Sequence, residues 1–116
     1  MIHRIGVHQD DFQAIKVGEK KVEVRLNDYN KQKIKVGDTI QFVNFPQEDE
    51  RVHVQVIRLK RYATFTELYQ DIPLDYFTDE ESEVKELVHE AYDIYPPELE
   101  EQWGVLAIYY KVLIHI

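Results

Sequence analysis

Cysteine is absent from the sequence, which excludes disulfide bonds and thiolate metal sites. Apolar runs are short: none approaches the roughly 18 residues of a membrane-spanning helix, and the N-terminus has no apolar signal-peptide segment. The histidines are scattered without close ligand spacing, so we expect no metal site among them: His3, His8, His53, His89 and His115. These absences predict a soluble, cytoplasmic protein without a metal, another cofactor or a membrane partner.

Basic residues are scarce in the second half of the chain. Residues 1–61 contain 12 Lys or Arg and 9 Asp or Glu, whereas residues 62–116 contain 2 and 13, and the whole chain has a formal net charge of −8. An acidic half disfavours a long polyanion wrapped around the whole surface, but it permits a local basic patch that grips one nucleotide or a short single strand. Because the chain has 116 residues and is 44% hydrophobic, we expect one domain over residues 1–116.

The stretch GEKKVEVRL, residues 18–26, is the segment around which the chain is organised. A glycine turn leads into a strand whose successive side chains alternate between a core face and a charged face. The core face carries Val22, Val24 and Leu26, and the charged face carries Lys21, Glu23 and Arg25. Lys20 stands where the turn becomes the strand. Three ionisable groups, Lys20, Glu23 and Arg25, therefore converge near the start of this strand, either as a solvated surface or as a functional cluster.

The remaining pattern predicts an α+β fold. Alternating or continuous apolar runs predict strands over residues 2–7, from after Gly18 to about residue 27, and over residues 39–45, 51–60 and 105–116. In the fourth of these, Ile57 and Leu59 break the alternation of Val52, Val54 and Val56, which suggests a bulge or burial on both faces. About five strands, with helices inserted after the first and before the last, argue for a small, strongly curved mixed sheet or barrel.

Capping signals predict where the helices begin. Asp10 with Gln13 predicts a helix over residues 11–17 that ends at Gly18, and Thr64 with Glu67 predicts a short helix that ends before Pro73. Thr78 with Glu81 has the same signature, and it precedes an amphipathic stripe of Val84, Leu87, Val88 and Ala91. Pro96 and Pro97 open a last helix, which Gly104 stops.

Two stretches of the sequence resemble the signature of the ASCH family, the ASC-1 homology domains. The first is F-x-x-I-x-x-G-x-K-x-x-E-x-R-L over residues 12–26, and the second is Q-x-I-x-V-G-D-x-I-x-F over residues 32–42. The later stretches YATFxxLY, from residue 62, and YPPELEEQWGVLAI, from residue 95, also resemble bacterial single-domain members. The resemblance covers nearly the whole chain.

The resemblance implies a PUA-like β-barrel with a cleft edged by the motif strand. Family members are expected to bind RNA or nucleosides, and one bacterial subgroup hydrolyses the amide of N4-acetylcytidine. Carried over from that subgroup, Lys20 would be the catalytic lysine and Glu80 would fall near the catalytic glutamate. Glu23 stands where the subgroup has its catalytic threonine.

Three functional interpretations follow for the ionisable cluster. In a binding module, Glu23 accepts a hydrogen bond from an exocyclic base amine, Arg25 or Lys20 meets phosphate, and Tyr29 or Phe45 stacks on the base. In an amidohydrolase, Lys20 beside Arg25 has a lowered pKa and acts as base or nucleophile, and Glu23 relays a proton. In the third, Glu23 and Arg25 are only a satisfied pair in the barrel mouth.

Three other features have simpler expected roles. Alternating lysines at residues 31, 33 and 35 predict either a solubilising or a phosphate-facing edge. Asp38, in a Val-Gly-Asp turn, is expected to cap local backbone N–H groups and is left out of the site. Trp103 and Tyr109 are expected to be core or barrel-wall residues rather than stacking platforms.

Overall fold

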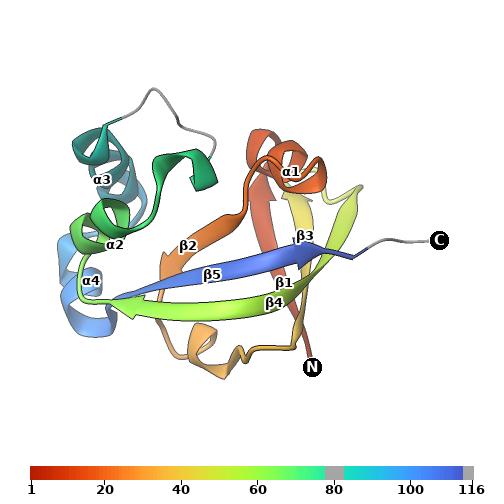
Figure 1. Cartoon of the computed structure of the whole chain (residues 1–116), viewed down its shortest axis with the longest axis horizontal. Helices are drawn as coiled ribbons and strands as arrows, with labels where there is room; N and C mark the ends of the chain where they lie inside the picture. Colours follow the sequence, from red (N-terminus) through yellow and green to blue (C-terminus); the bar gives the residue numbers. More distant parts are fainter. Residues whose placement is uncertain (78–82, 114–116) are drawn as a thin grey trace.

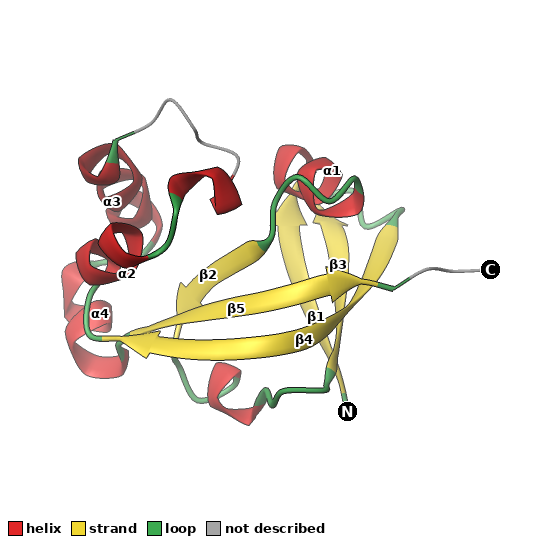
Figure 2. Cartoon of the chain, in the orientation of Figure 1, coloured by secondary structure: helices red, strands yellow, loops and turns green. Residues whose placement is uncertain are grey.

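A curled, five-stranded mixed sheet forms the centre of the computed structural model, which describes residues 1–77 and 83–113 (Figures 1 and 2). The strands lie in the order β1-β3-β4-β5-β2; β1 pairs with β3 in parallel and the other pairs are antiparallel. Their bounds are β1 Ile2–His8, β2 Val22–Leu26, β3 Thr39–Phe45, β4 Arg51–Tyr62 and β5 Val105–Val112. The predicted α+β class and strand count are therefore confirmed.

The sheet curls into a half-barrel, so that its two edge strands approach each other. The Arg25 Nη2 atom on β2 donates to the carbonyl oxygen of Gly6 on β1 at 2.9 Å, although the two strands lie at opposite ends of the strand order. The inner face encloses one apolar cluster, which includes Phe42, Val54 and Ile108. Curvature of this kind explains why the last strand is apolar at nearly every position: both of its faces are covered.

Helix α1, Gln9–Lys16, closes one end of the half-barrel by burying Phe12 and Ile15 in the inner cluster. The helix begins two residues earlier than predicted, and the expected cap at Asp10 is wrong, because His8 is the N-cap and makes no side-chain cap bond. Asp10 and its neighbour lie instead in the first turn, where carboxylates interact favourably with the helix dipole.

The other helices cover one part of the outer face of the sheet and form a second apolar cluster with β2 and β5. They are α2 Phe65–Asp71, α3 Val84–Ile94 and α4 Pro97–Trp103, with 3-10 turns η1 at Lys31–Lys33 and η2 at Leu74–Phe77. The Thr64 cap is confirmed, since its hydroxyl accepts from the Glu67 N–H at 3.1 Å. The cap predicted at Thr78 lies outside the described residues. Within the described ranges, no helix is long and apolar enough to cross a membrane.

A bulge in β4 changes which side chains face outward. The register of β4 against β5 shifts between Val56 and Arg58, so the broken alternation at Ile57 is a bulge, as predicted. Before it, Val52, Val54 and Val56 face the inner cluster. After it, Arg58 lies opposite Tyr109, on the outer face of the sheet.

Candidate functional site

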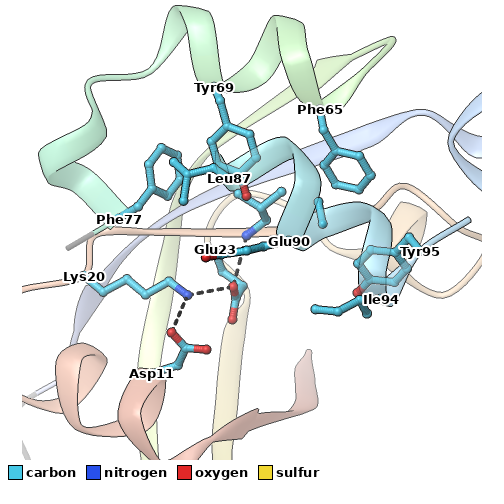
Figure 3. A pocket seen from close by; sticks show the side chains of 12 residues that line it. Asp11, Lys20, Glu23, Phe65, Tyr69, Phe77, Leu87, Glu90, Ile94 and Tyr95 are labelled. Atoms are coloured by element: carbon cyan, nitrogen blue, oxygen red, sulfur yellow. Dashed lines mark hydrogen bonds and ion pairs between the residues drawn. The ribbon is translucent and has the colours of Figure 1, made fainter. Parts of the chain in front are cut away.

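Lys20, Glu23 and Asp11 meet at the mouth of the half-barrel (Figure 3). The Lys20 ammonium lies 3.1 Å from Glu23 Oε1 and 3.4 Å from Asp11 Oδ1. On the other side of Glu23, Arg25 Nη2 lies 3.5 Å from Oε2. Only 8% of Lys20 and 5% of Glu23 is exposed, so these two charged side chains are turned into the protein. Lys21, which was expected on the same face as Glu23, precedes β2 and is exposed.

The connection between α1 and β2 holds Lys20 in place. The N–H groups of Glu19 and Lys20 both donate to the carbonyl of Ala14, at 2.9 and 3.1 Å, so this segment closes around the end of the helix before the strand starts at Val22. Gly18, with φ of 81°, makes the turn that this closure requires. From the neighbouring strand β5, the Tyr110 hydroxyl donates to the Lys20 carbonyl at 2.6 Å. Helix α1, the Gly18 turn and strand β5 therefore fix the backbone from which the Lys20 side chain extends.

The charge on Lys20 is stabilised by its neighbours. Burial by itself lowers the pKa of the Lys20 ammonium, but the carboxylates of Glu23 and Asp11 outweigh burial and hold this pKa above its usual value. The expectation of a lowered pKa for Lys20 is therefore wrong. The cause expected for that shift, the neighbouring charge of Arg25, was also wrong. The Glu23 carboxylate lies between the Lys20 and Arg25 cations.

Glu23 is held in its ionised form. Burial raises the pKa of this carboxyl, but Lys20, Arg25 and the backbone N–H of Val24 together hold the pKa below its usual value. The pKa of the Arg25 guanidinium is lowered by burial and raised more strongly by Glu23 and by the hydroxyl of Tyr95. The cluster is thus one buried anion between two cations, which is a stable arrangement for accepting hydrogen bonds from a ligand.

Two cavities adjoin at Glu23. The first has a volume of about 170 Å³ and the second about 200 Å³. Both are lined by Asp11, Glu23, Val24, Ile94 and Tyr95. The first continues past Lys20 to an apolar wall made of Phe65, Tyr69, Phe77, Leu87 and Ala91, with Glu90 at its side. The second continues along β1 and includes Arg25, His8 and Phe45. Together they form a cleft between α1, α3 and the free edge of β2.

The predicted site residues have different positions relative to this cleft. Lys20, Glu23 and Arg25 come together in it, and Phe45 lies in the second cavity with 54% of its surface exposed. Tyr29 lines neither cavity; it is 69% exposed, and the Lys33 ammonium lies 4.9 Å from its ring centre. Glu80 lies outside the described residues. The predicted convergence of Lys20, Glu23 and Arg25 in space is therefore confirmed.

The alternating lysines at residues 31 and 33 lie away from the cleft. Lys31 and Lys33 line a separate recess of about 240 Å³ with His3 and Arg4, and neither lysine reaches the cleft. Asp38 has the local role expected of it, since its carboxylate accepts from the Lys35 N–H at 3.0 Å and bonds the His3 ring at 2.8 Å.

Several residues of the cleft were missed from the sequence. Asp11 had been assigned only to the start of a helix, yet its carboxylate is the second partner of Lys20. Tyr95 and Ile94 come from the end of α3, some 70 positions from the motif strand, and line both cavities. The stretch that begins at residue 95 was part of the family resemblance, and this was the one signal in the sequence that could have pointed to Tyr95. In the described ranges, no three His, Asp or Glu side chains are arranged to hold a metal ion.

Known proteins share this fold. A family model described as the ASCH domain matches residues 5–114. The crystal structure of hypothetical protein PH0355 has a TM-score of 0.87 and 28% identity, and the match covers 97% of this chain and 100% of that chain. For the solution NMR structure of Protein PF0455 from Pyrococcus furiosus, the TM-score is 0.79, the identity is 28%, and the coverage is 99% and 100%.

A more distant similarity supports the fold alone. The ASCH domain from Lactobacillus crispatus JV V101 is 16% identical to this chain, with a TM-score of 0.64 and coverage of 98% of this chain and 80% of that chain. No curated protein matches the chain.

Proposed function

This chain belongs to the ASCH-domain family, as its motif predicts, and on that premise we propose that its cleft binds a nucleoside unit, free or within RNA, through a base that bears an exocyclic amine. ASCH domains are PUA-like and are associated with RNA binding. Family membership does not say which part of a ligand enters the cleft. We place the base there, with its amine at a carboxylate oxygen of Glu23.

The observation that carries this proposal is the state of Glu23 Oε2. Oε1 is occupied by Lys20 and by the Val24 N–H, each at 3.1 Å. In the described part of the chain, Oε2 has one partner, Arg25 Nη2, at the long distance of 3.5 Å. A buried, ionised carboxylate accepts hydrogen bonds and cannot donate them. Oε2 is therefore suited to an N–H donor, and the residue that carries it lines both cavities.

The neighbourhood of Glu23 suits the rest of a base. Because the Val24 N–H bonds to Glu23 rather than to β5, it is on the free edge of β2, and in an antiparallel strand the Val24 carbonyl is on the same edge. That carbonyl supplies a second acceptor beside Oε2. Phe45 and Tyr95 provide aromatic surface in the second cavity, on which a base can stack.

The charges in the cleft favour the base over the phosphate. Three carboxylates, Asp11, Glu23 and Glu90, line the two cavities together with the cations Lys20 and Arg25. Both cations are already paired with Glu23. A phosphate placed among these carboxylates would be repelled, so the phosphates of a bound nucleotide belong outside the cavities.

Amide hydrolysis of N4-acetylcytidine or a similar acylated nucleoside is the second candidate. Its support is the position of the Lys20 ammonium, which reaches the cavity 3.1 Å from Glu23 and so could donate a hydrogen bond to a carbonyl oxygen. The geometry supports it less well than binding, because a protonated lysine is neither a base nor a nucleophile. The low pKa of the Glu23 carboxyl makes it a weak proton acceptor for Lys20.

Calorimetric titration with cytidine and, separately, incubation with N4-acetylcytidine test the two candidates. Saturable cytidine binding without release of cytidine from the acetylated nucleoside is the expected result. Turnover that disappears in Lys20→Ala, with the variant folded, would assign hydrolysis instead. Absence of both binding and turnover in the folded protein would contradict both candidates.

A further inference from the structure

Three tyrosines and three cations form a continuous row on the outer face of the sheet. The Lys21 ammonium lies 5.5 Å from the ring centre of Tyr76, and the Tyr76 and Tyr109 rings meet edge to face at 6.5 Å. The Arg58 guanidinium lies 5.1 Å from the Tyr109 ring centre. Lys60 lies 5.2 Å from the ring of Tyr62. We call these six residues the tyrosine–cation row.

The fold builds this row from segments that are far apart in sequence. Figure 1 shows β4 and β5 running side by side, with helices α2 to α4 gathered at one end of them. The β4 bulge places Arg58 opposite Tyr109 and Lys60 opposite Ala107, so both cations stand on the outer face. At the other end of the row, the Lys21 N–H donates to the Tyr76 carbonyl at 2.9 Å, which ties η2 to the start of β2.

The row begins at the rim of the cleft. Lys21 follows Lys20 in the chain, and Tyr76 precedes Phe77; Lys20 and Phe77 both line the first cavity. From there the row crosses β5 to β4. A ligand whose base lies beside Glu23 would reach the row at Tyr76 and Lys21, where η2 meets the start of β2.

The row is a positive patch on an acidic protein. Lys21 and Arg58 are exposed, and each stands over a tyrosine ring, an arrangement that leaves their N–H groups available to anions. Lys60 is partly neutralised, because its ammonium and the Tyr62 hydroxyl both bond to Asp71 at 2.6 Å. Only 2 of the chain's 14 Lys and Arg lie in residues 62–116, so cations from the first half of the sequence supply this patch.

We propose that the tyrosine–cation row binds the backbone and flanking bases of a single-stranded RNA whose recognised base occupies the cleft. This proposal rests on the proposed function, and it specifies that the physiological ligand is a strand and not a free nucleoside. The exposed cations contact phosphates, and a base can stack on the guanidinium plane of Arg58, which covers the ring of Tyr109. Tyr109 itself is half-buried against the second apolar cluster, as expected of a wall residue. The cleft has no unpaired cation for phosphate among its described residues, and the row supplies them.

The test compares charge reversals at the two exposed cations of the row with a matched control. Lys21→Glu and Arg58→Glu alter exposed side chains, so both variants are expected to fold. Arg51→Glu makes the same charge change on the same strand, seven residues away, which is up to about 23 Å along β4. Binding of a fluorescein-labelled, mixed-sequence 12-nucleotide RNA to the full chain is measured by anisotropy at several salt concentrations, and cytidine binding is measured by calorimetry.

Lys21→Glu and Arg58→Glu are each expected to weaken RNA binding about tenfold and to reduce the salt slope by about 0.7 for each lost phosphate contact. Arg51→Glu should change RNA affinity less than twofold, and all three variants should bind cytidine like the unsubstituted protein. Equal losses in all three variants would overturn the proposal, and so would RNA that binds no tighter than cytidine. Displacement of the RNA by polyglutamate at equal charge concentration would overturn it in favour of an acidic protein partner. If the unsubstituted protein does not bind cytidine at all, that result would instead contradict the proposed function.

Discussion

The Nζ atom of Lys20 lies 3.1 Å from Oε1 of Glu23, and both side chains are almost fully buried. The two residues reach this contact from different elements, one from the turn after α1 and the other from β2. An ion pair removed from water costs desolvation and recovers it only while both partners are present. The pair is therefore a sensitive point for both folding and ligand recognition.

The pair predicts strong non-additivity between substitutions. Lys20→Met and Glu23→Gln are each expected to lower the free energy of unfolding by about 3 kcal/mol, because each leaves a buried charge with a weaker set of partners. The double variant should lose less than the sum by about 2 kcal/mol. Urea denaturation of the four proteins measures the coupling, and losses that add within about 0.5 kcal/mol would show that the pair is not coupled.

The same pair predicts how stability depends on pH. The lowered pKa of Glu23 gives a stabilisation that is present above pH 4.5 and is lost as the pH falls through the folded-state pKa. The raised pKa of Lys20 gives a second stabilisation, which is present below pH 10.5 and is lost as the pH rises through the folded-state pKa of Lys20. The stability gap between the unsubstituted protein and Glu23→Gln should therefore be constant near neutral pH and narrow in acid. Urea midpoints from pH 3 to 8 measure it, and a gap that widens in acid would contradict the assignment.

Tyr110 is predicted to act through the Lys20 backbone. Tyr110→Phe removes the 2.6 Å hydrogen bond to the Lys20 carbonyl and leaves a buried acceptor without this donor. We expect a loss of about 1–3 kcal/mol in the free energy of unfolding. Tyr29→Phe is the matched control, since Tyr29 is 69% exposed, and should change stability by less than about 0.5 kcal/mol. If the two substitutions change stability equally in thermal or urea denaturation, the Tyr110 hydroxyl does not help to hold Lys20 in place.

The Thr64 cap predicts a local effect on α2. Thr64→Ala removes the acceptor of the Glu67 N–H and is expected to cost about 1 kcal/mol. Thr66→Ala makes the same substitution within the first turn of the helix, where no cap bond is lost, and should cost less. Urea denaturation compares the two, and an equal or larger cost for Thr66→Ala would contradict the capping role.

Local patterns predicted most of the fold. The strand at residues 39–45 agrees with the observed β3 at both ends, and the broken alternation at Ile57 marks the observed bulge. The start of α1 was predicted less accurately, because it lies two residues before the expected position. The signal at Asp10 was ambiguous because an acidic residue serves equally well as a cap and in the first turn. The start of β2 was also misplaced, because the bonds that delay it run back to Ala14 and could not be read from residues 18–21.

The site was predicted in its composition but not in its environment. The motif strand brought Lys20, Glu23 and Arg25 together correctly, since their spacing is local. The direction of the Lys20 pKa shift was wrong because the carboxylates of Glu23 and Asp11 together outweigh burial, and α1 places Asp11 beside the ammonium from nine positions away. Tyr95 and Ile94 were missed for the same reason, because the curl of the sheet and the packing of α3 decide what faces β2.

The most direct test of the account is a comparison of cytidine and uridine binding by calorimetry, in the unsubstituted protein and in Glu23→Gln. The two nucleosides differ at two adjacent positions of the base: cytidine has an amine donor at C4 and an acceptor at N3, whereas uridine has a carbonyl acceptor at C4 and an N–H donor at N3. A hydrogen bond to a charged acceptor is worth about 1.5–3 kcal/mol, so cytidine should bind at least about tenfold tighter than uridine. Glu23→Gln should remove most of that preference. Equal binding of the two nucleosides, or a preference that survives Glu23→Gln in a folded protein, would contradict the claim that Glu23 recognises a base amine.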